Sequence, residues 1–137
     1  MSAPPDDARI GRSILVVDDD PDFLMQLVLQ LRAAGFEPAS AASREEAEAS
    51  LARRWPDLVI TDLSMESPDA GFLLCQRVKE RRPATPVVIV TAVAYETALS
   101  SQAKLRDERG WAKADAILSK PVRAEELKRQ LGRLLGA

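Results

Sequence analysis

The chain has 137 residues, a net charge of −2 and 46% hydrophobic residues, which predicts one soluble domain with no bulk electrostatic attraction to nucleic acid or membranes. Histidine is absent, which excludes a histidine-based hydrolase, a histidine-ligated zinc site and a phosphohistidine carrier. The single cysteine, Cys75, excludes an internal disulfide and fits a reducing cytoplasm, and no apolar run approaches the ~20 residues of a membrane-spanning helix.

Short apolar runs and amphipathic stretches alternate along the chain, after a lead-in at 1–12 that we expect to be disordered. The runs, the second of them weak, predict strands at 13–17, 37–41, 58–61, 86–90 and 116–119. The stretches that follow them predict helices at 21–34, 44–55, 71–82, 96–109 and 127–135. The first of these helices has an apolar stripe that begins with Phe23. This alternation predicts an α/β fold, a doubly wound parallel sheet with helices on both faces.

Local signals mark several of the predicted helix ends. A capping box begins at Ser43, and Gly35 fits a helix C-terminus. The pairs Arg53-Arg54 and Arg81-Arg82 lie where two helices are predicted to end, and we expect them to complement the helix dipoles. We expect Trp55, next to the first pair, to be a packing residue.

Four of the predicted strands end at residues that can carry chemistry. These are Asp18 and Asp19 after the first strand, Asp62 after the third, Thr91 after the fourth and Lys120 after the fifth. In an open parallel sheet the carboxyl ends of the strands share one edge, and ligands bind there where the strand order reverses. We therefore expect these residues to converge, although they are far apart in the chain.

Three carboxylates at this edge would repel one another. Each pair at 4 Å costs about 1 kcal/mol in water and about 4 kcal/mol at an effective dielectric constant of 20. A divalent cation removes that cost, and an all-oxygen site without histidine or cysteine favours a hard ion such as Mg²⁺. The Asp62 carboxylate is then an adequate nucleophile for a phosphoryl group, while Lys120 and Thr91 can bind phosphoryl oxygens. With no histidine in the chain, another molecule must deliver the phosphate.

The chain resembles the receiver domain of two-component response regulators, the CheY-like family, in four segments. They are ILVVDDDPDF (14–23), PDLVITDLSM (56–65), PVVIVTA (86–92) and ILSKP (117–121). The resemblance covers nearly the whole chain and implies a single, stand-alone receiver domain at 13–137. It also implies a flavodoxin-like sheet with the strand order 2-1-3-4-5.

By position in these segments, the resemblance assigns roles around a Mg²⁺ ion. Asp62 is the expected phosphoacceptor and also a metal ligand. Asp19 is expected to bind the metal directly and Asp18 mainly through water. The backbone carbonyl of Ser64, two residues past Asp62, is the expected third protein ligand.

The resemblance also implies how the switch works. Thr91 supplies the switch hydroxyl, Lys120 senses the phosphoryl group, and the Lys120–Pro121 bond is cis. A sensor histidine kinase or a phosphotransfer protein donates the phosphoryl group in the cytoplasm, and protein–protein contacts pass the signal to a downstream target. The expected chemistry is self-catalysed phosphoryl transfer and slow autodephosphorylation, with no direct contact to nucleic acid or membrane.

The sequence departs from the family pattern in three places. Glu66 stands where the family has proline, and Gly71 lies nine residues past the phosphoacceptor, so the loop carries one extra residue. Ile117 occupies the position of the aromatic switch residue, and Tyr95 is the candidate substitute for that role. The segment Ala92–Ala114 is longer than usual, which predicts a partner surface peculiar to a subset of receivers.

Two other functions fit part of the pattern. A phosphatase or phosphotransferase of the haloacid dehalogenase type has a first motif like Asp18-x-Asp20, and Thr91 and Lys120 echo its next two motifs. That family also needs a late acidic pair, where this chain has only Glu125-Glu126 inside a predicted helix. The third reading is a binding module that has lost phosphorylation; the intact acidic set argues against it, and the departures above leave room for it.

Overall fold

The computed structural model describes residues 12–65, 67, 69–92 and 114–136 and forms one five-stranded parallel sheet. Its strands are β1 (Ser13–Val17), β2 (Glu37–Ala41), β3 (Leu58–Asp62), β4 (Val87–Thr91) and β5 (Ala116–Ser119). They lie in the order β2-β1-β3-β4-β5, which confirms the doubly wound, flavodoxin-like sheet. The described helices are α1 (Pro21–Ala33), α2 (Arg44–Arg53), α3 (Ala70–Arg81) and α5 (Ala124–Leu135). The helix predicted at 96–109 and the lead-in up to residue 11 lie outside the described residues.

Helix ends have local causes in the sequence. Asp20 caps the start of α1, because its Oδ1 accepts a hydrogen bond from the backbone N–H of Asp22 at 3.0 Å. Just beyond the end of α1, Gly35 has φ of 95°, a left-handed conformation that glycine adopts at no steric cost. Ser43 caps α2 as predicted, with its Oγ accepting from the third helical N–H at 3.1 Å.

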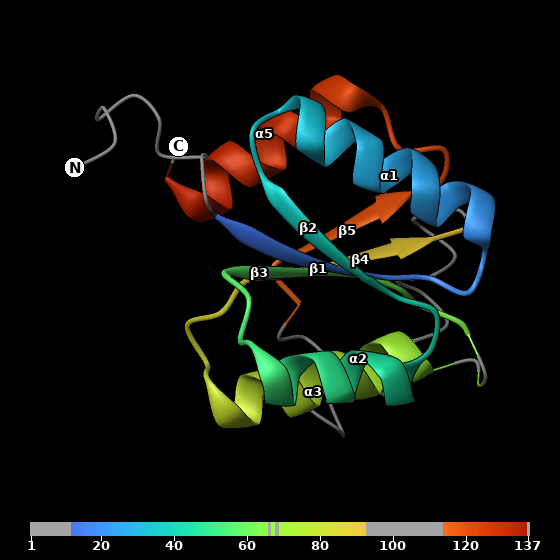
Figure 1. Cartoon of the computed structure of the whole chain (residues 1–137), viewed down its shortest axis with the longest axis vertical. Helices are drawn as coiled ribbons and strands as arrows, with labels where there is room; N and C mark the ends of the chain where they lie inside the picture. The colour runs from blue at the N-terminus through green and yellow to red at the C-terminus, as the bar shows by residue number, and fades with distance from the viewer. Residues whose placement is uncertain (1–11, 66, 68, 93–113, 137) are drawn as a thin grey trace.

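Helices cover both faces of the sheet, with α1 and α5 on one side and α2 and α3 on the other (Figure 1). The first face buries the helix residues Leu27, Leu31, Leu127 and Leu131. The second buries Ala47, Leu51, Phe72, Leu74, Cys75 and Val78. Because both faces are buried, β1, β3 and β4 are apolar almost throughout, and polar residues gather at their ends. No helix in the described part of the chain is both long and apolar enough to cross a bilayer.

The strand register brings the predicted site residues to one edge of the sheet. Asp62, the last residue of β3, pairs with Val90, so that Thr91 lies one residue further along β4. Thr91 pairs with Ser119, so that Lys120 lies one residue past the end of β5. The backbone N–H of Lys120 donates to the carbonyl of Thr91 at 2.8 Å, which continues the ladder past the strand ends.

The opposite end of the sheet is held by Lys79 of α3, whose side chain is only 8% exposed. Its Nζ donates to the carbonyls of Thr85 at 2.7 Å and Pro83 at 3.3 Å, and to Oδ2 of Asp115 at 2.7 Å. The same Oδ2 accepts from the backbone N–H of Val87 at 2.8 Å. Lys79 therefore joins the end of α3 to the starts of β4 and β5, a contact that the sequence did not reveal.

Candidate functional site

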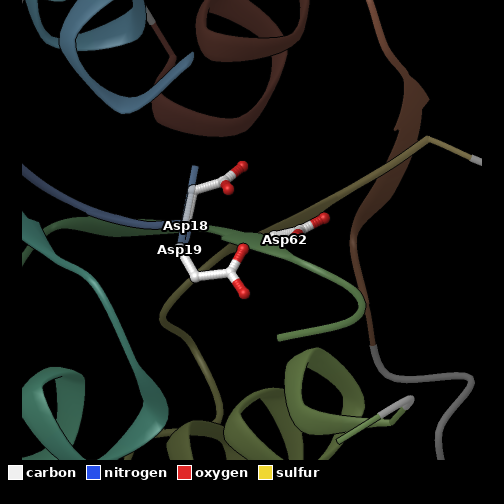
Figure 2. Close-up of side chains that lie close together, drawn as sticks. All are labelled: Asp18, Asp19 and Asp62. Carbon is white, nitrogen blue, oxygen red and sulfur yellow. The ribbon is translucent and has the colours of Figure 1, made fainter. Parts of the chain in front are cut away.

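Three carboxylates converge at the carboxyl edge of the sheet, as predicted. Asp18 and Asp19 directly follow β1, and Asp62 ends β3 (Figure 2). One carboxylate oxygen from each lies within 4.8 Å of the others. Asp18 is 1% exposed and Asp62 8%, whereas Asp19 is open to solvent. The cluster thus has two buried acids and one at its mouth.

Asp18 is the most buried of the three acids, and its two oxygens differ. Oδ1 accepts from the backbone N–H of Asp20 at 2.8 Å, which fixes the turn into α1. Oδ2 lies 2.9 Å from Nζ of Lys120, but no described residue donates a hydrogen bond of good geometry to it. This oxygen therefore has a counter-charge and spare capacity to accept, as a metal ligand or its bound water would require.

Lys120 is held between several partners. Its Nζ lies 2.9 Å from Oδ2 of Asp18 and 3.8 Å from Oδ1 of Asp62. The same nitrogen lies 4.3 Å from the ring centroid of Phe23, a cation–π distance. Burial by itself would lower the pKa of Lys120, but contact with Asp18 and the charge of Asp62 raise it on balance. Lys120 is therefore a fixed positive charge, shared between two acids.

The carboxyl group of Asp62 is strongly perturbed by its surroundings. Its pKa is raised from 3.8 to about 6, chiefly by burial and also by the negative charges of Asp18 and Asp19. The positive charge of Lys120 opposes the rise in pKa without cancelling it. At neutral pH the Asp62 carboxylate is ionised, but burial and the neighbouring acids make the ionised form unfavourable. A bound cation, or a covalent substituent on a carboxylate oxygen of Asp62, would reduce this electrostatic cost.

The other predicted residues occupy the same edge. Thr91 is buried at the end of β4, and Ser64 is exposed two residues past Asp62. The Lys120–Pro121 bond is cis, which confirms the expectation from the resemblance. The structure thus brings the predicted residues to one region at the carboxyl edge of the sheet.

Two residues with a part in the site were not predicted. The ring of Phe23 was predicted to lie on the apolar stripe of a helix, and it also contacts Lys120. Gly71 packs against the backbone of Asp62 and Leu63: its N–H donates to the carbonyl of Leu63 at 2.7 Å. A Cβ at Gly71 would overlap the carbonyl oxygen of Asp62 and lie 2.8 Å from Cα of Leu63. The sequence marked Gly71 only as a shifted loop residue.

A divalent cation fits this donor set. Three acidic side chains offer oxygens at close range, and one of the buried oxygens has spare capacity. Counting Asp18, Asp19, Asp62 and Lys120 as ionised leaves a local charge of −2, which a doubly charged ion would balance. Oxygen ligands without nitrogen or sulfur favour Mg²⁺ over the softer transition metals.

The structure describes some of the residues at which the sequence departs from the receiver family or fits another function. Asp20 serves as the N-cap of α1, as its position at the start of the helix allows, and is absent from the acidic cluster of Asp18, Asp19 and Asp62. Ile117 is partly buried and packs on the core beneath the sheet. Glu66, Tyr95 and most of the long segment before β5 lie outside the described residues.

Comparison with known proteins identifies the same family that the sequence resembles. Residues 14–132 match the family model of the response regulator receiver domain. RpaA of Synechocystis, named as a DNA-binding dual master transcriptional regulator, is 32% identical over 125 residues, which cover 89% of this chain and 48% of RpaA. This chain therefore spans about half the length of that curated relative.

Solved structures share the fold over most of their length. A CheY-like receiver domain protein from Methanospirillum hungatei superposes with a TM-score of 0.77 at 25% identity, covering 92% of this chain and 94% of that one. TrrA, a response regulator of Thermotoga maritima, superposes with a TM-score of 0.74 at 26% identity, covering 90% and 98%. The TrrA structure is a complex with Mg²⁺ and BeF.

Proposed function

Because the chain belongs to the response regulator receiver domain family of two-component signalling, we propose that Asp62 accepts a phosphoryl group and that this modification switches its protein contacts. The observation that carries the proposal is the convergence of Asp62 with Asp18, Asp19 and Lys120 at one sheet edge. We assign the receiver domain to residues 13–137. The donor is a sensor histidine kinase or a phosphotransfer protein in the cytoplasm, and the recipient of the signal is a downstream protein.

In this proposal Asp18, Asp19, Asp62 and the backbone carbonyl of Ser64 hold a Mg²⁺ ion. The ion would balance the local negative charge and bind phosphoryl oxygens. The complex of TrrA with Mg²⁺ and BeF supports this assignment, since the two chains share the receiver fold and 26% of their residues. Asp18, with its spare buried oxygen, suits a ligand that acts through water.

The side chains of the site then have separate tasks. An ionised oxygen of Asp62 attacks the phosphorus atom while the bond from phosphorus to the histidine nitrogen of the donor protein breaks, and that nitrogen leaves as neutral imidazole after taking up a proton. The raised pKa of Asp62 makes its carboxylate a stronger base than that of an exposed aspartate. Lys120, already 3.8 Å from Asp62, stabilises the charge on the transferred phosphoryl oxygens. The hydroxyl of Thr91 donates to one of these oxygens and transmits the change along β4. The same residues support self-catalysed transfer and a slow autodephosphorylation.

The expectation of no direct contact with nucleic acid concerns this domain alone. RpaA is named as DNA-binding and is about twice as long as the matched region. The downstream partner of the present chain is therefore proposed as a protein, reached through a surface of the receiver domain.

Phosphorylation in vitro tests the assignment of Asp62. Wild type, Asp62→Asn and Asp22→Asn are incubated with acetyl phosphate with and without Mg²⁺, and the gain of one phosphoryl group is followed by mass spectrometry. Asp22 is an exposed acid in the first turn of α1, so its variant matches the change in charge. We expect a Mg²⁺-dependent gain in wild type and Asp22→Asn and none in Asp62→Asn. A further variant, Asp18→Asn, separates the alternatives. A mass gain that survives in Asp62→Asn but is lost in Asp18→Asn would favour the phosphatase. The absence of a gain in wild type and in every variant would favour the binding module.

A further inference from the structure

A second polar cleft lies at the amino end of β3, at the far end of this strand from Asp62. Its volume is about 420 Å³, and four of the seven residues that line it are arginines: Arg53, Arg54, Arg81 and Arg82. The last turn of α2 and the end of α3 supply these arginines, and Trp55 also lines the cleft. Arginine is thus concentrated here in a chain whose net charge is −2.

Trp55 organises the cleft. Its indole Nε1 donates to Oγ1 of Thr85 at 2.9 Å, which fixes the ring between α2 and β4. The guanidinium carbon of Arg82 lies 4.9 Å from the ring centroid and that of Arg81 5.5 Å. Cation–π contacts at these distances hold two exposed guanidinium groups close to one aromatic ring. Two neighbouring side chains of like charge are therefore gathered in one place.

The positive charge of the cleft is mostly unbalanced. Arg54 pairs with Glu37 at 3.3 Å, and both side chains are exposed. Among the described residues, no carboxylate pairs with Arg53, Arg81 or Arg82. Helix dipoles account for arginine in the last turns of α2 and α3. They do not account for the side chain of Arg82, the C-cap residue of α3, lying against the ring of Trp55.

We propose that this cleft binds a compact, polyvalent anion of the oligophosphate class, either inorganic or as the phosphate chain of a nucleotide. The planar guanidinium fork matches two phosphate oxygens at once, and several uncompensated charges favour a ligand with more than one negative charge. The volume lies in the range of small-molecule sites. A concave site on a chain with net charge −2 suits a small anion better than a nucleic acid duplex.

Calorimetric titration of the whole chain with pyrophosphate, ADP and AMP tests the proposal. The buffer contains EDTA and constant ionic strength, and the Asp62→Asn background removes competition from the phosphoacceptor. We expect pyrophosphate and ADP to bind, each about tenfold more weakly to Arg81→Gln and Arg82→Gln. Equal affinities for pyrophosphate and ADP would identify the phosphate chain as the group that is recognised. A higher affinity for ADP than for pyrophosphate would identify a nucleotide as the ligand.

Matched variants separate a built site from general attraction. Arg32 is also an exposed arginine in a last helical turn, that of α1, and Arg32→Gln is expected to change the affinity less than twofold. Arg82→Lys keeps the charge but loses the fork, so its affinity should fall between those of wild type and Arg82→Gln. Thermal melting confirms that each variant is folded. No binding of pyrophosphate or ADP, or equal weakening by Arg32→Gln and Arg82→Gln, would overturn the proposal.

A fluorescence readout locates the ligand. The chain has two tryptophans, so Trp111→Phe leaves Trp55 as the only indole. We expect pyrophosphate to change the emission of Trp55 with the midpoint found by calorimetry, because the ligand draws the guanidinium groups of Arg81 and Arg82 from the ring. Heat of binding without any change in this emission would place the anion elsewhere and contradict the proposed site.

Discussion

Two lysines form ion pairs with aspartates at opposite ends of the sheet, and they differ in how well their partners are satisfied. At the amino end, Lys79 donates to two backbone carbonyls and to Asp115, whose Oδ2 also accepts a backbone hydrogen bond. At the carboxyl end, Lys120 is shared between Asp18 and Asp62, and the buried Oδ2 of Asp18 faces the ammonium group of Lys120 at 2.9 Å but accepts from no backbone N–H among the described residues.

This difference between the two lysine–aspartate contacts distinguishes a structural ion pair from a candidate functional site built of the same residue types. An ion pair between a buried lysine and a more exposed aspartate, with complete hydrogen bonding, holds elements together and does not need a ligand. A cluster with more acids than bases, and with spare acceptor capacity, is costly until a cation or a phosphoryl group arrives. We therefore expect substitutions at the two ends to change stability in opposite directions.

The largest effect is expected for Lys79→Met. Removal of the ammonium group leaves two carbonyls without this donor and Asp115 without its counter-charge, so the free energy of unfolding should fall by about 3 kcal/mol, roughly 1 kcal/mol for each lost hydrogen bond. Urea unfolding at pH 7.5 in EDTA measures this loss. Lys128→Met, at an exposed lysine on α5, is the control and should lie within about 0.5 kcal/mol of wild type. A loss below about 1 kcal/mol for Lys79→Met would refute the comparison.

Asp62→Asn should have the opposite sign. A pKa raised from 3.8 to about 6 means that folding disfavours the ionised carboxylate, by at most about 3 kcal/mol. Above pH 6 the folded state bears this whole cost, and as the pH falls from 6 towards 3.8 protonation of the folded state relieves it. In EDTA, Asp62→Asn should therefore be more stable than wild type at pH 7.5, with a gain that shrinks towards pH 4.

Asp115→Asn serves as the counterpart at the other end of the sheet. The same change in chemistry there weakens the contact with Lys79 and should lower stability at pH 7.5. If Asp62→Asn and Asp115→Asn shifted the urea midpoint in the same direction, the contrast between the two ends would be wrong.

Addition of Mg²⁺ should give a smaller stabilisation, confined to the carboxyl end. At a concentration ten times the dissociation constant, a ligand that binds only the folded state adds about 1.4 kcal/mol. Wild type and Lys79→Met should both show this gain in urea unfolding, and EDTA should reverse it. Asp19→Asn removes one acid of the cluster and should lose most of it. An undiminished gain in Asp19→Asn would place the ion elsewhere.

The smallest effect is expected for Phe23→Leu. The ring lies 4.3 Å from Nζ of Lys120, a contact worth about 0.5–1 kcal/mol. Its loss should lower stability by that amount and slow phosphorylation by acetyl phosphate, because Lys120 is held less firmly. Phe23→Tyr keeps the ring and should behave as wild type in both measurements. Equal behaviour of the Leu and Tyr variants would show that the ring does not position Lys120.

Much of the fold could be predicted from the sequence. The strands β1, β3 and β4 are buried on both faces, so their apolar runs were visible and their bounds were predicted to within one residue. The convergence of the acidic residues was also predicted, because parallel strands must bring their carboxyl ends to one edge.

Contacts between side chains from separate elements could not be predicted. Lys79 and Asp115 are 36 residues apart, and no period or motif relates them. Phe23 was predicted as part of an apolar stripe, since a helical pattern gives a face and not the partner across it. The closeness of Gly71 to the carbonyl of Asp62 depends on how α3 is seated beneath the loop.

The sequence by itself therefore determined the parallel sheet and the edge where Asp18, Asp62 and Lys120 meet, because apolar runs and alternating helices are visible along the chain; the strand order followed from the resemblance to the receiver family. Only the tertiary structure decided the energetic state of that edge: which carboxylate oxygen is buried with the ammonium group of Lys120 as its neighbour, how far the pKa of Asp62 rises, and which lysine donates to three acceptors. These quantities depend on burial and on distances of a few ångströms between residues remote in the chain, which no sequence pattern encodes.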